Sequence, residues 1–133
     1  MADKLHFDLV SPEKRLFEGD VDMVVVPGEE GDFGVLPGHA PLMSAIRMGA
    51  ISVHDGGTVT RTFIRGGFAE VTPDGLSVLA EEAIDLSSFD ASGLATEIQN
   101  ARDDITAAKD EAARDRAEAA LARLEALRDA AAA

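Results

Sequence analysis

Cysteine is absent from this chain of 133 residues. Its absence excludes a disulfide framework, thiol catalysis and a thiolate metal site. Long apolar runs are missing as well: no stretch approaches the roughly 20 apolar residues of a membrane span. The N-terminus, MADKLHFDLV, has no apolar run of signal-peptide length. We therefore expect a chain that is cytoplasmic, or peripheral on a cytoplasmic face, with no direct membrane span.

Positive charge is also scarce. The 12 lysines and arginines stand against 25 aspartates and glutamates, which gives a net charge of −13 at pH 7. This balance argues against a surface for nucleic acid or anionic lipid, which needs basic patches. It favours solubility, or a partner that carries basic patches. The hydrophobic fraction of 46% is enough for a core, and the length predicts one globular domain, or one domain with a small appendage.

Apolar and polar residues alternate from residue 4 to about residue 85. The alternating sets are Leu5, Phe7 and Leu9; Val21, Met23 and Val25; Ile51 and Val53; and Leu76, Val78 and Ala80. A period of two marks strands with one buried face. Short strands separated by frequent Gly and Pro turn signals predict an antiparallel sandwich or barrel. Residues 54–58 and 72–76 are predicted hairpin turns, because glycine tolerates the positive φ that such turns need.

The composition changes at Ser88. No proline follows it, glycine occurs only at Gly93, and alanine becomes very frequent. Alanine with Glu, Arg, Leu and Lys is helix-forming composition. The chain is therefore predicted to consist of a β domain over residues 1–87 and a helical part over residues 88–133.

Two helices are predicted in the second part. One helix face follows a 4-3-4-3 rhythm, through Leu94, Ile98, Ala101, Ile105 and Ala108. Ser87 or Ser88 is its expected N-cap, since Asp90 follows Ser87 at capping-box spacing. The later large apolar residues are Leu121, Leu124 and Leu127. If one continuous helix ran to the end, their stripe would lie on the order of 100° around the helix axis from the first face. We predict a break near residues 109–116, with Asp110 as the second N-cap. No glycine or proline enforces the break, so the pair of helices could act as a switch between two packings.

Catalysis and metal binding find little support in the sequence. The three histidines, His6, His39 and His54, show no helical metal-ligand spacing. A hydrolase triad of Ser44, His39 and Asp32 can be imagined, but no Gly-x-Ser-x-Gly elbow accompanies it. The run from Gly28 to Gly38 does not match a phosphate-binding loop. We expect no catalytic residue, no metal and no cofactor.

Residues 29–43, EEGDFGVLPGHAPLM, combine three glycines and two prolines in one loop-like stretch, so their backbone is unusually constrained. Within it, Pro37-Gly38-His39-Ala40-Pro41 fixes φ at two positions and frees it at one. Two interpretations stay open at this point. The segment is either a rigid loop whose imidazole caps a backbone group, or a preformed docking edge.

The stretches SPEKRLFEG (11–19) and VVVPGEEGDFGVLPGHAPL (24–42) resemble the epsilon subunit of bacterial F-type ATP synthases. GGFAEV (66–71) and LAEEA (79–83) are similar to later strands of that family. The resemblance covers the whole chain, and the segment Gly-x-x-Pro-Gly-His-x-Pro is a specific signal for it. It implies a mainly β fold with α: an N-terminal antiparallel β-sandwich followed by a C-terminal two-helix hairpin.

The resemblance also implies a function and partners. Such a subunit is a non-catalytic part of the rotor, packed on the gamma subunit and resting on the ring of c subunits at the cytoplasmic face of the bacterial inner membrane. The segment 29–43 then faces the ring, and the family's acid maps to Asp32. The implied contact residues are Glu29, Glu30, Gly31, Asp32, Phe33 and His39. A free-standing β-sandwich binding module or small hydrolase is the alternative.

The family's helices can fold against the sandwich or extend into the alpha/beta catalytic head, where they inhibit ATP hydrolysis in some members. Some members bind ATP at an Ile/Leu-Asp-x-x-Arg-Ala motif. Here the aspartate is present as Asp90, but Gly93 stands in place of the arginine and Leu94 in place of the alanine. A missing guanidinium removes the fork that engages a phosphate or a base. The sequence therefore predicts no nucleotide site and at most weak regulation.

Overall fold

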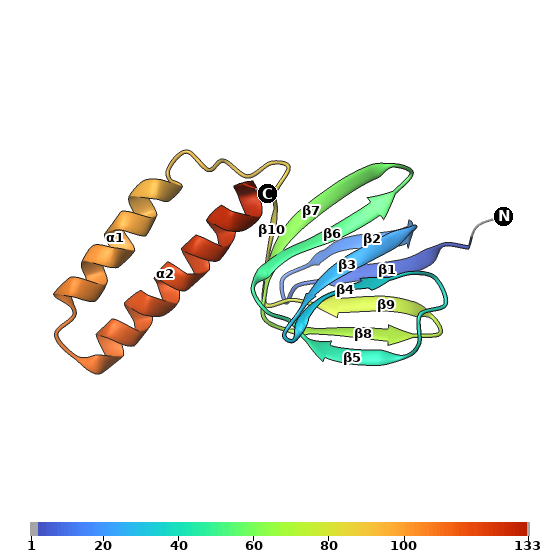
Figure 1. The fold of residues 1–133 in the computed structure, drawn as a ribbon, viewed down its shortest axis with the longest axis horizontal. Helices are drawn as coiled ribbons and strands as arrows, with labels where there is room; N and C mark the ends of the chain where they lie inside the picture. Colours follow the sequence, from blue (N-terminus) through green and yellow to red (C-terminus); the bar gives the residue numbers. More distant parts are fainter. Residues whose placement is uncertain (1–2, 133) are drawn as a thin grey trace. The chain divides into compact units, whose positions relative to one another are not determined.

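The computed structural model describes residues 3–132, and the chain forms two compact units that meet between Ser87 and Ser88. The first contains all ten strands and the second contains both helices (Figure 1).

The first unit is a sandwich of two five-stranded sheets. Its strands are β1 (Leu5–Val10), β2 (Arg15–Val21), β3 (Met23–Gly28), β4 (Gly31–Val35), β5 (Leu42–Ala45), β6 (Gly49–Asp55), β7 (Thr58–Arg65), β8 (Phe68–Thr72), β9 (Gly75–Leu79) and β10 (Glu82–Asp85). One sheet has the order β2-β1-β9-β8-β5 and the other β10-β7-β6-β3-β4. All pairings are antiparallel except β1 with β9, which is parallel. The predicted fold class is confirmed, and this one parallel pair departs from it.

The core lies between the sheets and is built by the alternation seen in the sequence. Phe7 on β1, Ile51 on β6 and Leu76 on β9 are buried there. On β3 the predicted face is wrong. Val24 and Val26 are fully buried, whereas Met23 and Val25 are only half-buried. The chain leaves one sheet at the end of β2 and enters the other at β3, so the inward phase shifts by one residue.

Glycine closes the tight connections of the sandwich. The β6–β7 hairpin turns at Gly56 and Gly57, with φ of 61° and 84°, and this turn was predicted. At Gly67, between β7 and β8, φ is 96° and an added Cβ would lie 1.7 Å from the carbonyl oxygen of Leu79. Only glycine fits such a close approach of two backbones.

The second unit is a pair of contacting helices, α1 (Leu94–Ala107) and α2 (Glu111–Ala132). The predicted break is confirmed: the Asp110 carboxylate accepts the backbone N–H of Ala113 at 2.7 Å and caps α2. The predicted cap of α1 is wrong. Its N-cap is Gly93, without a side-chain cap. The Ser87 backbone N–H and hydroxyl are instead bound by Asp85, at 2.9 and 2.7 Å.

Three buried residues of α1 and four of α2 form the apolar contact of this unit. They are Leu94, Ile98, Ala101, Ala117, Leu124, Leu127 and Ala130. An ion pair between Arg102 and Glu125, with nitrogen and oxygen 3.6 Å apart, connects the two helices. The predicted stripe of Leu121, Leu124 and Leu127 has two buried members, because Leu121 is half-buried. No helix among residues 3–132 combines the length and apolarity that a membrane crossing requires.

Candidate partner-binding surfaces

The segment 29–43 is not one loop. Glu29 and Glu30 form the tip of the β3–β4 hairpin, β4 follows as the edge strand of its sheet, and the chain enters β5 at Leu42. At the tip, Gly28 faces Gly31, and a Cβ on Gly28 would lie 2.7 Å from the Gly31 carbonyl oxygen. The tip is therefore a close-packed turn. Both glutamates are exposed, and neither forms an ion pair within residues 3–132.

The predicted contact residues Asp32 and Phe33 have different surroundings. Phe33 is half-buried and packs against the hydrophobic core. The Asp32 side chain is 58% exposed and forms an ion pair with Arg47. Arg47 lies in the connection between β5 and β6, and its backbone N–H donates to the carbonyl of Pro27 at 3.0 Å. The sequence pattern did not indicate Arg47, because the pairing depends on the packing of two segments 15 residues apart.

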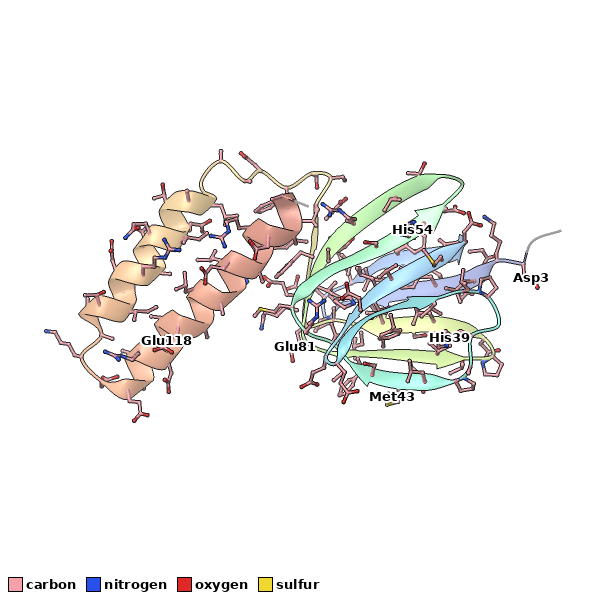
Figure 2. All side chains as sticks on the ribbon, in the orientation of Figure 1. Asp3, His39, Met43, His54, Glu81 and Glu118 are labelled. Atoms are coloured by element: carbon pink, nitrogen blue, oxygen red, sulfur yellow. The ribbon has the colours of Figure 1, made fainter. Side chains whose placement is uncertain are left out.

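His39 is separated from the hairpin tip by the whole of β4, which spans about 16 Å at 3.3 Å per residue. It lies in the connection from β4 to β5, where its Nδ1 lies 2.7 Å from the Ala40 carbonyl oxygen (Figure 2). The carbonyl can only accept, so Nδ1 carries the proton. The imidazole thus caps a backbone group, which is the first of the two interpretations left open by the sequence. The six predicted contact residues do not form one cluster.

A shallow hollow surrounds His39. His6, Asp20, the segment 37–41 and the β8–β9 turn line it. The Asp20 carboxylate, 3.1 Å from His6 Nδ1, raises the pKa of that imidazole above its ordinary value of 6.5. Within residues 3–132, no group of three or more metal-ligating side chains comes together.

Lys4 forms two ion pairs at this end of the sandwich. Its Nζ lies 2.7 Å from carboxylate oxygens of both Asp22 and Asp55. Hydrogen bonds to these two carboxylates raise the pKa of Lys4. The pKa of Asp22 is lowered, mainly by the hydrogen bond from Lys4 and also by one from the Gly56 N–H. The contact ties β1 to the sheet that contains β3 and β6, and we read it as structural.

The three members of the imagined hydrolase triad are occupied elsewhere. The Ser44 hydroxyl donates to the carbonyl of Ala45 at 2.9 Å, His39 binds Ala40, and Asp32 binds Arg47. The structure does not bring them together as a nucleophile, a base and an orienting acid.

An exposed apolar patch lies on the outer face of the sheet that contains β5, β8 and β9. We define the outer patch as Met43, Phe68 and Leu79, which are 65%, 56% and 52% exposed. Phe68 pairs with Leu79 across β8 and β9, and Met43 projects from β5 away from the sandwich (Figure 2). Asp8 and Glu70 line the same shallow surface. Contiguous exposed apolar side chains with a polar rim are typical of a protein interface.

The sequence carried a weak signal for the outer patch. The predicted core residues Leu76 and Val78 in β9, with Ala80 directly after it, leave Leu79 on the opposite face. An outward-facing leucine could thus have been predicted. Its contact with Phe68 and Met43 needed the strand order of the sheet.

Asp90, the one residue that matches the nucleotide motif, lies in the segment before α1. Its carboxylate accepts the backbone N–H of Ser92 at 2.9 Å, and this bond lowers the pKa of Asp90. Gly93 follows as the N-cap of α1, and open space surrounds the position of its missing Cβ. Among residues 3–132, no side chain outside the immediate chain neighbours comes within 4 Å of that position, so no cation takes the place of the missing arginine there.

Comparisons with known proteins agree on one family. The family described as ATP synthase, Delta/Epsilon chain, beta-sandwich domain matches residues 4–86. The ATP synthase epsilon chain of Maricaulis maris is 67% identical over 96% of this chain and 96% of its own length. That of Rhodospirillum rubrum is 51% identical over 92% of this chain and 91% of its own.

A solved structure extends the match to the fold. A chain in the cryo-EM structure of the Euglena gracilis mitochondrial ATP synthase, OSCP/F1/c-ring, has a TM-score of 0.86 and 28% identity, covering 98% of this chain and 82% of its own. The fold, the family match over the sandwich and near full-length relatives at high identity lead to one conclusion: this chain belongs to the ATP synthase delta/epsilon family, among its epsilon chains.

Proposed function

We propose that this chain is a rotor subunit in the central stalk of an F-type ATP synthase. It couples ion flow through the ring of c subunits to ATP synthesis in the catalytic head, and it catalyses no reaction itself. The observation that carries the proposal is the combination of an exposed apolar patch and a close-packed acidic hairpin on a sandwich of this family. The chain works peripherally, on the cytoplasmic face of the bacterial inner membrane.

The outer patch is the surface we assign to the gamma subunit. Its three large apolar side chains lose contact with water only if another protein covers them, which is favourable for association. The acids at its edge, Asp8 and Glu70, suit a partner whose apolar surface has basic side chains beside it.

The hairpin tip is the surface we assign to the polar loops of the c ring. Glu29, Glu30 and Asp32 give it acidic side chains, while the Gly28–Gly31 packing fixes its shape. Phe33 supports the tip from inside, and His39 stiffens the far connection of β4. Direct contact is therefore assigned to Glu29–Asp32, while Phe33 and His39 have supporting roles.

Cross-linking tests the ring contact, and the introduced cysteine is the only one this chain contributes, because its sequence has none. Glu30→Cys in the assembled enzyme should form a disulfide with a cysteine placed in the polar loop of the c subunit. Thr58→Cys, at the β6–β7 hairpin, is the matched control and should not. Efficient cross-linking of Glu30→Cys only to the catalytic beta subunits would refute the assignment.

The helical unit is assigned a weak regulatory role through the alpha/beta head. Residues 90–133 carry six basic and ten acidic side chains, so attraction to an acidic surface of the head is poor. Gly93 supplies no guanidinium for ATP. Adding the full-length subunit to the catalytic head should change ATP hydrolysis only modestly, and calorimetry with ATP should show no saturable heat. Strong inhibition, or saturable binding, would contradict this part.

A further inference from the structure

The connection between β5 and β6 is fixed to the base of the β3–β4 hairpin through its backbone. The Arg47 N–H donates to the Pro27 carbonyl at 3.0 Å, and Ile46 forms an isolated bridge with Gly28. The Glu29 N–H donates to Ala45 at 2.9 Å. Arg47 therefore starts from a backbone position that cannot move independently of the hairpin.

The side chain of Arg47 is held through both terminal nitrogens of its guanidinium. One terminal nitrogen, Nη2, binds Asp32, and the other, Nη1, donates to the Met48 carbonyl at 3.4 Å. Gly49 leaves room for this conformation: a Cβ there would lie 3.1 Å from Nη1 and 3.3 Å from the Pro27 Cβ. The φ of Gly49 is not in the left-handed region, so the need for glycine at this position comes from space and not from backbone conformation.

The acids of the hairpin therefore divide into two kinds. Glu29 and Glu30 are exposed and form no ion pair within the described residues, so they act as free charges whose attraction for a partner is screened by salt. Asp32 is neutralised by Arg47, and this pair has little net charge. It keeps directional hydrogen-bonding groups, because guanidinium has five N–H donors and the Arg47 side chain is still 46% exposed.

From this geometry we propose that Arg47 is a positioning residue for the ring contact. It holds the Asp32 carboxylate at one place on β4, so that the partner meets a preformed carboxylate–guanidinium pair and not a mobile acid. The chemistry that fits this pair is a neutral polar side chain or backbone amide, which can both donate and accept. The inference rests on the proposed function, since the ring of c subunits is the partner.

The test measures the rate of disulfide formation between Glu30→Cys and a cysteine in the c-subunit polar loop, in the assembled enzyme. Arg47→Ala frees the Asp32 side chain, which must then be ordered on contact. We expect the rate to fall between about 2-fold and about 10-fold, the usual cost of immobilising one side chain. Arg47→Lys keeps the charge but loses the forked guanidinium, so its cross-linking rate should be intermediate between the rate with Arg47 and the rate with Arg47→Ala. Gly49→Ala, which displaces the guanidinium, should act like a milder Arg47→Ala.

A second measurement needs no partner. Amide hydrogen exchange of the isolated full chain should speed up in residues 29–35 of Arg47→Ala, and Arg15→Ala is the control for both measurements. Arg15 on β2 pairs with Asp8 on β1 at 3.0 Å, and both strands belong to the sheet that does not contain β4. The acid of this pair is less exposed than Asp32, 22% against 58%. Loss of Arg15 should change neither the hairpin exchange nor the cross-linking.

The outcomes separate the two proposals. If Glu30→Cys fails to cross-link even with Arg47 present, the ring contact is wrong, while exchange still tests the positioning. If Glu30→Cys cross-links at the same rate with Arg47→Ala as with Arg47 in place, the role of Arg47 is overturned and the ring contact stands. A wild-type rate in Arg47→Lys would also overturn it, because charge alone would then suffice.

Discussion

Phe68 is the central side chain of the outer patch, and its replacement gives a sharp measure of that surface. Burying a large apolar side chain completely is worth about 1.5–3 kcal/mol. Phe68 is 56% exposed in the free subunit, so about half of this gain, roughly 0.8–1.7 kcal/mol, is left for a partner that covers it. Phe68→Ser should therefore weaken binding to the isolated gamma subunit by about 4- to 16-fold.

Titration calorimetry of the purified subunit with gamma measures this change. Val59→Ser is the matched control, since Val59 is 51% exposed but lies on β7 in the other sheet. We expect its affinity to stay within about 2-fold of wild type, because a surface substitution outside an interface changes little. Both variants should stay folded with a modest and similar decrease in urea midpoint, because each side chain is also about half buried in the free subunit. Wild-type affinity in Phe68→Ser, or equal weakening by Val59→Ser, would refute the assignment of the patch.

Backbone, charge and capping give three further tests. Gly67→Ala should lower the free energy of urea unfolding by roughly 2–5 kcal/mol, because alanine there adds the cost of a positive φ to a clash with the Leu79 carbonyl. Gly38 has a φ of 82° but open space around it, so Gly38→Ala should lower the free energy of unfolding by only about 1–2 kcal/mol. The pKa of His6 is raised in the fold, so its protonated imidazole stabilises the fold below pH 6.5, and this stabilisation is lost as pH rises through the folded-state pKa. The unfolding temperature of wild type should therefore exceed that of His6→Gln by more near pH 5.5 than near pH 8.5. An equal difference at the two pH values would contradict this. Asp110→Ala should cost about 1 kcal/mol of helical stability, and unchanged helical circular dichroism through a urea titration would contradict that.

Local signals explain how much of the fold the sequence predicted. Alternation in β1 and β9, and the cap at Asp110, each depend on residues close together in the chain. The face of β3 was missed because the chain changes sheets after Val21, and no local pattern records that change. The cap of α1 was missed because Asp85 binds Ser87 first and the helix begins only at Leu94.

The candidate surfaces depended more on long-range packing. The acids of the hairpin tip were visible in the sequence, as was the special conformation around His39. The ion pair of Asp32 with Arg47 was not, because β4 and the β5–β6 connection meet only when the two sheets close on each other. The outer patch likewise depends on long-range pairing, because β5 and β8 are neighbours in one sheet although β6 and β7 of the other sheet separate them in the chain.

The junction between β5 and the β3–β4 hairpin explains why so many residues that constrain the backbone lie between residues 27 and 49. Here β5 belongs to one sheet and the β3–β4 hairpin to the other. Three backbone hydrogen bonds join the hairpin, the end of β5 and the β7–β8 connection: Glu29 to Ala45, Arg47 to Pro27, and Ile46 to Gly67. A force applied at the hairpin tip is therefore carried into both sheets and not into one flexible strand. On the proposed ring contact, a tip that yielded under load would lose torque between the ring and the stalk, so we expect its conformation to be fixed before contact.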